Sequence, residues 1–190
     1  MYVIVVHGAG GSVADHADFR SAVEARGGKT CGIDLLGHGE NRGDAFDAPG
    51  AYVHSYISPD EVLWGVSLGG YAVLHAAADN DVVPAVIAIA PTTEAIILER
   101  MHTWGVRIHP RFPEALEQSD VFEAVTRIAC PVLYVHARDE ERIPLAVSER
   151  LHALTPRSEL VVLESGGHSG PAHDPAVHEL TLDWLERVAS

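Results

Sequence analysis

The chain has 190 residues, and 13 lysines and arginines against 27 aspartates and glutamates give it a formal charge of −14. Apolar residues make up 47% and charged residues 21%, a composition that excludes a disordered chain. The length predicts a single domain, residues 1–190, that buries a core. Because so acidic a protein repels phosphate backbones and anionic lipids, we expect neither nucleic acid nor a membrane as a partner.

The N-terminus and the cysteines indicate the compartment. Met1 leads directly into an apolar run at 2–6, with no basic segment before it and no apolar stretch of spanning length. Cys31 and Cys130 lie far apart in the sequence and have no metal-binding spacing. We therefore expect no signal peptide, no transmembrane helix and a cytoplasmic, reducing location. Nothing in the sequence indicates the oligomeric state.

Short apolar runs rich in β-branched residues recur along the chain. Their continuous apolarity favours strands that are covered on both faces, and they lie at 3–6, 30–33, 62–66, 83–90, 132–135 and 160–163. Helical patterns lie between and after them, at 14–26, 68–78, 144–154 and 175–188. This alternation predicts an α/β fold in which helices cover both faces of a parallel sheet.

One region, residues 92–129, departs from the alternation. It has no strand-like run, and its helical patterns lie at 93–102 and 113–127. An insertion after the fourth strand lies at the carboxyl edge of the sheet, where α/β proteins bind ligands. Its large apolar residues Met101, Trp104 and Phe112 either pack the insertion onto the body of the protein or line a substrate pocket.

A glycine-rich segment, His7-Gly8-Ala9-Gly10-Gly11-Ser12, follows the first strand and precedes a helix. One interpretation is a dinucleotide-binding turn, with Asp34 after the second strand as a ribose ligand. The fingerprint is incomplete, because Val13 stands where its third glycine is needed. The other interpretation is a turn that directs backbone N–H groups at a developing oxyanion, since glycines leave the approach open.

The segment Gly65-Val66-Ser67-Leu68-Gly69 follows the third strand and opens the next helix. This is a G-x-S-x-G pattern in a strand–turn–helix context, in which glycines relieve the crowding of a tight turn and the serine is left accessible. The Leu68 N–H lies at the helix N-terminus, where positive partial charge favours an oxyanion. The pattern predicts that Ser67 is a nucleophile at a nucleophile elbow.

A serine nucleophile needs a base, and His168 is the best candidate because it follows the last strand and so lies at the same sheet edge as Ser67. His38, in Gly37-His38-Gly39, also follows a strand but precedes the serine, and we interpret it as a histidine of the pocket wall. The remaining histidines have no metal-ligand spacing beside a third ligand, so we predict no metal.

Together these segments resemble the α/β-hydrolase superfamily, specifically its small esterase-like members. The resemblance covers nearly the whole chain and rests on His7-Gly8, residues 34–39, the turn at Ser67, residues 130–136 and Gly167-His168. It implies a minimal α/β-hydrolase fold with a mostly parallel six-stranded sheet in the order 2-1-3-4-5-6, and a short helical cap at 92–129. It also implies Ser67 as nucleophile, His168 as base, and the N–H groups of Ala9 and Leu68 as oxyanion hole.

The acid of the implied catalytic triad has two candidates. Counting along the family pattern from Pro131, or back from Pro144, places Glu140 at the acid position. Asp139 is the usual residue type but stands one place early. A glutamate can also orient an imidazole and stabilise its charged form, so we favour Glu140 and keep Asp139 as the alternative. We expect the other carboxylate to lie in solvent or to cap the helix that begins near Pro144.

These residues predict a serine esterase that cleaves a small carboxylic ester or thioester through an acyl-enzyme on Ser67, with no cofactor. Esters are favoured over amides because an alkoxide or thiolate leaves more easily. Two alternatives remain open. One is a non-catalytic, ligand-binding member of the same fold, and the other is a C–C hydrolase or lyase that uses the same triad.

Overall fold

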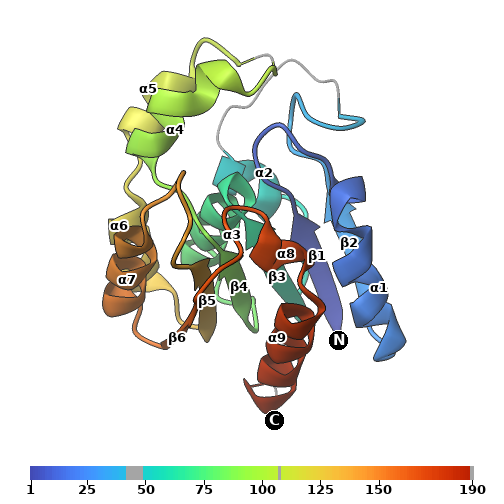
Figure 1. Cartoon of the computed structure of the whole chain (residues 1–190). Helices are drawn as coiled ribbons and strands as arrows, with labels where there is room; N and C mark the ends of the chain where they lie inside the picture. Colours follow the sequence, from blue (N-terminus) through green and yellow to red (C-terminus); the bar gives the residue numbers. More distant parts are fainter. Residues whose placement is uncertain (42–48, 107, 189–190) are drawn as a thin grey trace.

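The computed structural model describes residues 1–41, 49–106 and 108–188. A six-stranded sheet forms its centre, and every pair of neighbouring strands is parallel, in the order β2-β1-β3-β4-β5-β6 (Figure 1). The predicted α/β class and strand order are therefore confirmed. The strands are β1 (Tyr2–Val6), β2 (Lys29–Ile33), β3 (Glu61–Val66), β4 (Val86–Ile89), β5 (Val132–Ala137) and β6 (Ser158–Leu163).

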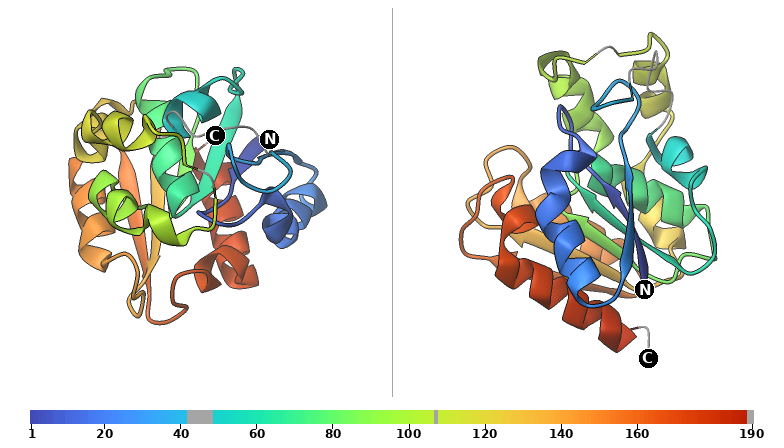
Figure 2. Two further views of the ribbon diagram at one scale, coloured as in Figure 1. Left: turned by 90° about the horizontal axis from the view of Figure 1, so that it is seen from above. Right: turned by 90° about the vertical axis from the view of Figure 1, so that its right-hand side faces the viewer.

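Helices cover both faces of this sheet. Figure 2 shows α1 (Ala17–Ala25) and α9 (Pro175–Val188) on one side, and α2 (Pro49–His54) and α3 (Leu68–Ala78) on the other. The short α8 (Gly170–His173) packs on the side of α1 and α9, whereas α6 (Val121–Ala124) and α7 (Leu145–Leu154) pack on the side of α3. None of the helices in these described parts combines the length and the apolarity that crossing a bilayer requires.

The core is divided by the sheet into two apolar clusters. Along β1, Val3 and Val5 belong to the cluster under α1 and α9, while Ile4 and Val6 belong to the cluster under α3. All four side chains are at most 1% exposed, because successive strand residues point to opposite faces and both faces are covered. This burial explains why the strand sequences are continuously apolar.

The first part of the segment between β4 and β5 forms helices beyond the carboxyl ends of the strands. These are α4 (Glu94–Arg100), the 3₁₀ helix η2 (Met101–Thr103) and α5 (Phe112–Glu117), at the top of Figure 1. The single helix expected at 113–127 is wrong, because α5 ends at Glu117 and α6 begins at Val121. The Asp120 carboxylate accepts hydrogen bonds from the N–H groups of Phe122 and Glu123, so it caps a new helix there.

Other boundaries also differ from expectation. The strand expected at 83–90 covers only Val86–Ile89, and Pro84 within the expected range has no N–H for a ladder. The helix expected at 14–26 begins as a 3₁₀ helix, η1 (Val13–His16), before α1. The short helices α2 and α8 were not expected, since each contains a proline and a glycine that lower helix propensity.

The backbones of β1, β3 and α3 meet closely at one point. A Cβ atom added to Gly65 would lie 2.4 Å from the Gly69 carbonyl oxygen, and one added to Gly69 would lie 2.2 Å from the Val6 carbonyl oxygen. No side chain fits at either position without moving backbone. These two glycines therefore set the distance between the start of α3 and the ends of two strands.

This contact generates a stability prediction. Gly65→Ala should lower the free energy of unfolding by at least about 3 kcal/mol, because the added methyl group meets backbone atoms rather than a flexible side chain. Urea unfolding followed by circular dichroism measures the change. Gly170→Ala is the matched control, since an added Cβ there meets no atom within 4 Å, and its change should stay within about 0.5 kcal/mol. Equal unfolding midpoints for the two variants would contradict the prediction.

Candidate active site

Ser67 lies in the turn between β3 and α3 in a conformation that L-residues rarely adopt, with φ 54° and ψ −112°. Backbone hydrogen bonds hold it there. Its N–H donates to Ile89 O at 2.9 Å, and its carbonyl oxygen accepts from Tyr71 N at 3.0 Å and Thr92 N at 3.3 Å. The residue is 8% exposed. The predicted elbow is therefore a strained turn fixed by the start of α3 and by the segment after β4.

Ser67 and His168 line the same cavity. This cavity, of about 320 Å³, lies between α4 and the carboxyl ends of the strands, and we call it the main cavity. A second cavity of about 230 Å³ also contains both residues, together with Ala9 and Arg142. Ser67 and His168 thus stand where two cavities meet, an arrangement that leaves room for substrate on either side of the serine.

Glu140 is the carboxylate that the structure places against His168. The His168 Nδ1–H donates to Glu140 Oε2, and the Glu140 side chain is fully buried. Its other oxygen accepts hydrogen bonds from the N–H groups of Arg142 and Ile143. Burial raises the pKa of Glu140, but the hydrogen bonds from His168 and from these N–H groups outweigh it, so the pKa lies below its usual range. Because Nδ1 donates to this carboxylate, Nε2 is the accepting atom of the neutral imidazole.

Asp139 is exposed to solvent, which is one of the two positions expected for the second carboxylate. It does not cap α7, which has no side-chain cap. Its carboxylate instead accepts hydrogen bonds from the N–H groups of Gly167 at 2.8 Å and Gly166 at 3.3 Å. The Gly167 N–H is the main cause that lowers the pKa of Asp139. Asp139 therefore holds the backbone of the loop at Gly166 and Gly167, and Glu140 orients the side chain of the next residue, His168.

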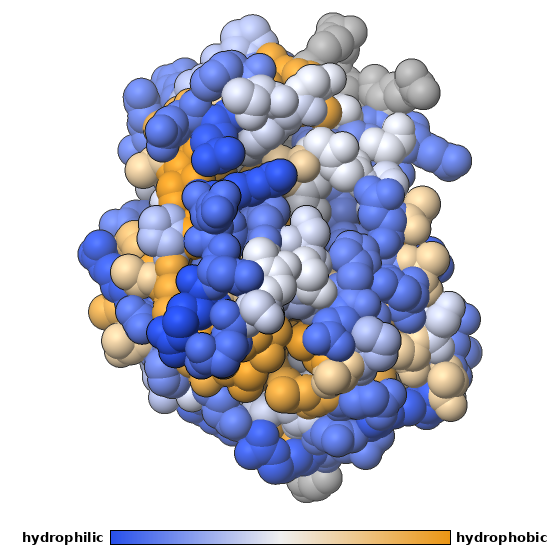
Figure 3. Space-filling model, viewed as in Figure 1, coloured by the Kyte–Doolittle hydropathy of each residue, from blue (hydrophilic) through white to orange (hydrophobic). Residues whose placement is uncertain are grey.

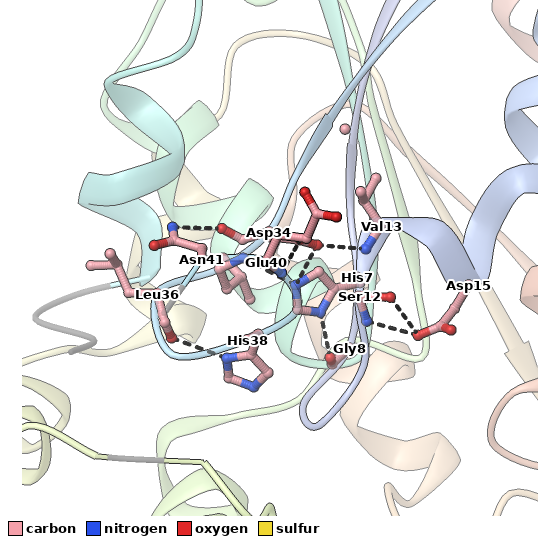
Figure 4. A network of polar contacts seen from close by, with 12 residues as sticks. His7, Gly8, Ser12, Val13, Asp15, Asp34, Leu36, His38, Glu40 and Asn41 are labelled. Atoms are coloured by element: carbon pink, nitrogen blue, oxygen red, sulfur yellow. Dashed lines mark hydrogen bonds and ion pairs between the residues drawn. The ribbon is translucent and has the colours of Figure 1, made fainter. Parts of the chain in front are cut away.

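Asp34 organises the glycine-rich loop rather than standing free for a ribose (Figure 4). Its carboxylate accepts hydrogen bonds from Val13 N at 2.7 Å and from Glu40 N at 2.9 Å. Next to it, the N–H of Leu35 donates to His7 Nε2 at 3.0 Å. Both oxygens of Asp34 are thus bound to backbone N–H groups. This argues against the dinucleotide interpretation and connects the loops that follow β1 and β2.

The glycine-rich loop lies directly beside the serine. A Cβ atom added to Gly8 would lie 3.4 Å from Ser67 Cβ and 4.0 Å from Ser67 Oγ. Across the residues that the structure describes, the N–H groups of Ala9 and Leu68 donate no hydrogen bond. Both residues line the main cavity. Two unoccupied N–H groups beside a hydroxyl are the donors that an oxyanion needs.

Of the residues predicted to form the pocket, some line the cavity and others lie behind its wall. Trp104 lines the main cavity. His38 is 2% exposed, its Nδ1 lies 3.0 Å from Leu36 O, and its ring lies 6.5 Å from that of Trp104, so it supports the wall from behind. Met101, directly after the C-terminus of α4, packs against the hydrophobic core. Within the described chain, neither His38 nor Met101 is part of the cavity lining.

Phe112 does not line the pocket of Ser67, so that prediction is wrong. The residue is 0% exposed and lies in the core cluster under α3. It borders a separate cavity of about 540 Å³, beside Tyr71 and Leu116. Phe112 begins α5, and α5 turns its apolar side chains toward α3 rather than toward the serine. The packing alternative for this residue is therefore the correct one.

Several residues of the main cavity were not predicted. Ile96, Ile97 and Arg100 form one face of α4, and Thr92 and Arg142 complete that side of the cavity. The signal for the α4 residues was present, since positions 96, 97 and 100 share a face of any helix at 93–102. Arg142 follows Glu140 by two residues, but only the turn that brings Glu140 to His168 makes it a neighbour of the serine.

One group of side chains in the described part of the chain has the composition of a metal site. His16, Asp18 and His173 offer ligand atoms that lie within 4.8 Å of one another. His173 Nδ1 already bonds to Asp18 Oδ2 at 2.8 Å, which satisfies both groups without an ion. The absence of a metal stays a prediction.

Known proteins resemble this chain in sequence. A sequence profile of the prolyl oligopeptidase family matches residues 1–190. RutD of Escherichia coli O1:K1, to which carbamate hydrolysis is ascribed, is 37% identical over 96 residues, which are 50% of this chain and 36% of RutD. The match therefore spans about a third of the length of that curated relative.

Solved structures resemble the whole chain at low sequence identity. Est1E from Butyrivibrio proteoclasticus with ferulic acid bound has a TM-score of 0.82 at 22% identity, covering 100% of this chain and 90% of that one. Monoacylglycerol lipase from Paleococcus ferrophilus has a TM-score of 0.76 at 18% identity, covering 98% and 94%. Likeness at this identity shows the fold, which is that of the α/β hydrolases. With the profile match over its full length, the chain belongs to the prolyl oligopeptidase family within the α/β-hydrolase superfamily.

Proposed function

We propose that this protein is a serine hydrolase that cleaves a small carboxylic ester or thioester through an acyl-enzyme on Ser67. The observation that carries the proposal is the pairing of His168 with the buried carboxylate of Glu140, at a cavity that Ser67 also lines. A histidine oriented in this way is a base whose Nε2 accepts a proton. Ser67 at a strained strand-to-helix turn is the hydroxyl that such a base activates.

The proposed reaction uses these groups in sequence. His168 Nε2 takes the proton of the Ser67 hydroxyl as Oγ attacks the carbonyl carbon, and Glu140 stabilises the imidazolium that forms. The N–H groups of Ala9 and Leu68 donate to the oxyanion. When the tetrahedral intermediate collapses, the alkoxide or thiolate leaves with the proton from His168. Water then attacks the acyl-enzyme by the same route and releases the acid, so no cofactor is required.

Small esters are favoured for two reasons. The main cavity, of about 320 Å³, is at the lower end of the size of small-molecule sites, so a small-molecule substrate fits it better than a polymer does. Est1E binds ferulic acid in its structure, and the Paleococcus protein is named a monoacylglycerol lipase, so esters and their acids occur among similar folds. RutD is ascribed a carbamate, and the family is named for a peptidase, so a test must include carbamate and amide substrates.

The first prediction concerns the nucleophile. Ser67→Ala should retain its fold and lose several orders of magnitude of p-nitrophenyl ester hydrolysis, because acyl transfer has no acceptor oxygen. A fluorophosphonate probe should label the parent protein and not the variant, as intact mass spectrometry would measure. Ser21→Ala, an exposed helix serine, is the control and should react like the parent.

Each outcome of that experiment discriminates between functions. A parent protein that is not labelled and hydrolyses no ester, carbamate or anilide would favour the ligand-binding alternative. A labelled protein that leaves esters intact would favour cleavage of C–C bonds or of amides. Ester turnover by Ser67→Ala close to that of the parent would refute the mechanism.

The second prediction separates the two carboxylates. Glu140→Gln should lower kcat by up to about 10⁴-fold, since an amide keeps the shape but loses the charge that fixes the tautomer of His168. Asp139→Asn should lower kcat by about tenfold or less, because an amide oxygen still accepts the Gly167 N–H. Glu141→Gln, at an exposed neighbouring position, is the control and should match the parent. The reverse order of the first two variants would assign the acid to Asp139.

A further inference from the structure

We propose that the substrate of this site is an anion, a small ester that carries a carboxylate, and that Arg100 and Arg142 bind this carboxylate. The inference rests on the proposed function and specifies its substrate class. Both arginines line the main cavity together with Ser67 and His168. Arg100 is the last residue of α4, and Arg142 follows the turn of Glu140, so they reach the cavity from separate segments of the chain.

The charge of the cavity is opposite to that of the protein. The whole chain has 27 acidic residues against 13 basic ones. In the described part of the chain, however, the lining of the main cavity includes two arginines and no aspartate or glutamate. On the face shown in Figure 3, strongly hydrophilic residues gather where α4 lies above the loop that follows β5. A local positive site in so acidic a protein indicates a ligand that is itself negative.

Both arginine side chains are available for a ligand. Elsewhere in the protein, Arg26, Arg127 and Arg187 pair with carboxylates. In the described residues, the guanidinium groups of Arg100 and Arg142 form no ion pair and no hydrogen bond. A guanidinium has five N–H donors in a planar fork that matches a carboxylate, so two unpaired forks beside one cavity form a suitable site for such a group.

Two acids on the segments that carry these arginines are held by other partners. Glu94, on the same helix as Arg100, lies 3.2 Å from His75 Nε2 and accepts from Val121 N at 2.8 Å. Glu140 is buried against His168 and accepts the backbone N–H of Arg142, not its side chain. The hydrogen bond to Glu140 also fixes the backbone of Arg142 close to the base. Glu94 and Glu140 are therefore occupied by other groups and leave both guanidinium groups unpaired.

The cavity also has an apolar part that fits a short carbon chain. Ile96 and Ile97 precede Arg100 on the face of α4 that lines the cavity, and Ile143 follows Arg142 on the opposite side. A substrate with a few methylene groups between its ester and its carboxylate would contact these isoleucines. Its carboxylate would then lie at the arginines while its ester carbonyl lies at Ser67.

A matched pair of substrates tests the proposal. Mono-p-nitrophenyl adipate and p-nitrophenyl hexanoate have acyl chains of equal length, and they differ by a carboxylate in place of the terminal methyl group. The parent protein should have the higher kcat/KM for the adipate ester. In the double variant Arg100→Gln/Arg142→Gln, the ratio of the two kcat/KM values should fall at least about tenfold, the size expected for a lost charge-assisted hydrogen bond.

The control has the same change in net charge. The double variant Lys29→Gln/Arg111→Gln removes two positive charges from exposed positions that the main cavity does not include, and the ratio should stay at the parent value. An equal fall in this variant would assign the effect to long-range attraction and overturn the site. A parent ratio at or below one, or an unchanged ratio in the double variant, would also overturn it.

A binding measurement separates this inference from the proposed function. Calorimetric titration of the Ser67→Ala protein with adipate needs no turnover, and the affinity should fall at least about tenfold when the two arginines are also replaced. Adipate binding that is lost with the arginines, in a protein that hydrolyses no ester, would support the anion site and contradict the esterase. Ester turnover together with adipate binding that does not depend on the arginines would support the esterase and contradict the anion site.

Discussion

The site depends on the close contact of three backbones. Gly65 and Gly69 let the first turn of α3 lie against the ends of β1 and β3, and no side chain fits between them. Several features follow from this one contact. It gives Ser67 its positive φ, brings Gly8 beside the serine, and places Leu68 at the cavity. The apolar helix behind it, buried along nearly its whole length, keeps the turn in place.

Carboxylates hold several loops of this protein in place by accepting hydrogen bonds from backbone N–H groups. Asp34 after β2, and Asp139 and Glu140 after β5, accept hydrogen bonds from backbone N–H groups of loops at the carboxyl edge of the sheet. Such charge-assisted bonds are stronger than neutral ones, so they hold loops that have no ladder of their own. A chain with many acids can thus fix its loops while the lining of its cavity carries the opposite charge.

The sequence predicts the strand order and the segments of the site well, because strand ends and tight turns have local signatures. It places Ser67, His168 and Glu140 at one sheet edge, where Ser67 and His168 share a cavity and Glu140 holds the His168 ring. It wrongly assigns Phe112 to the substrate pocket, because the sequence does not show whether an apolar helix residue faces the core or a cavity. The structural role of Asp139 was also missed, since its partners lie 27 and 28 residues away in the chain.

The adjacent carboxylates of Asp139 and Glu140 divide one task between them. One holds the backbone of the loop at Gly167, and the other holds the ring of the next residue, His168. The turn after β5 therefore depends on its length as well as on these two side chains. Adding or removing a single residue before Asp139 would shift both carboxylates by one position, so that neither would face its present partner. Among related chains, the number of residues between β5 and the acid should therefore stay constant.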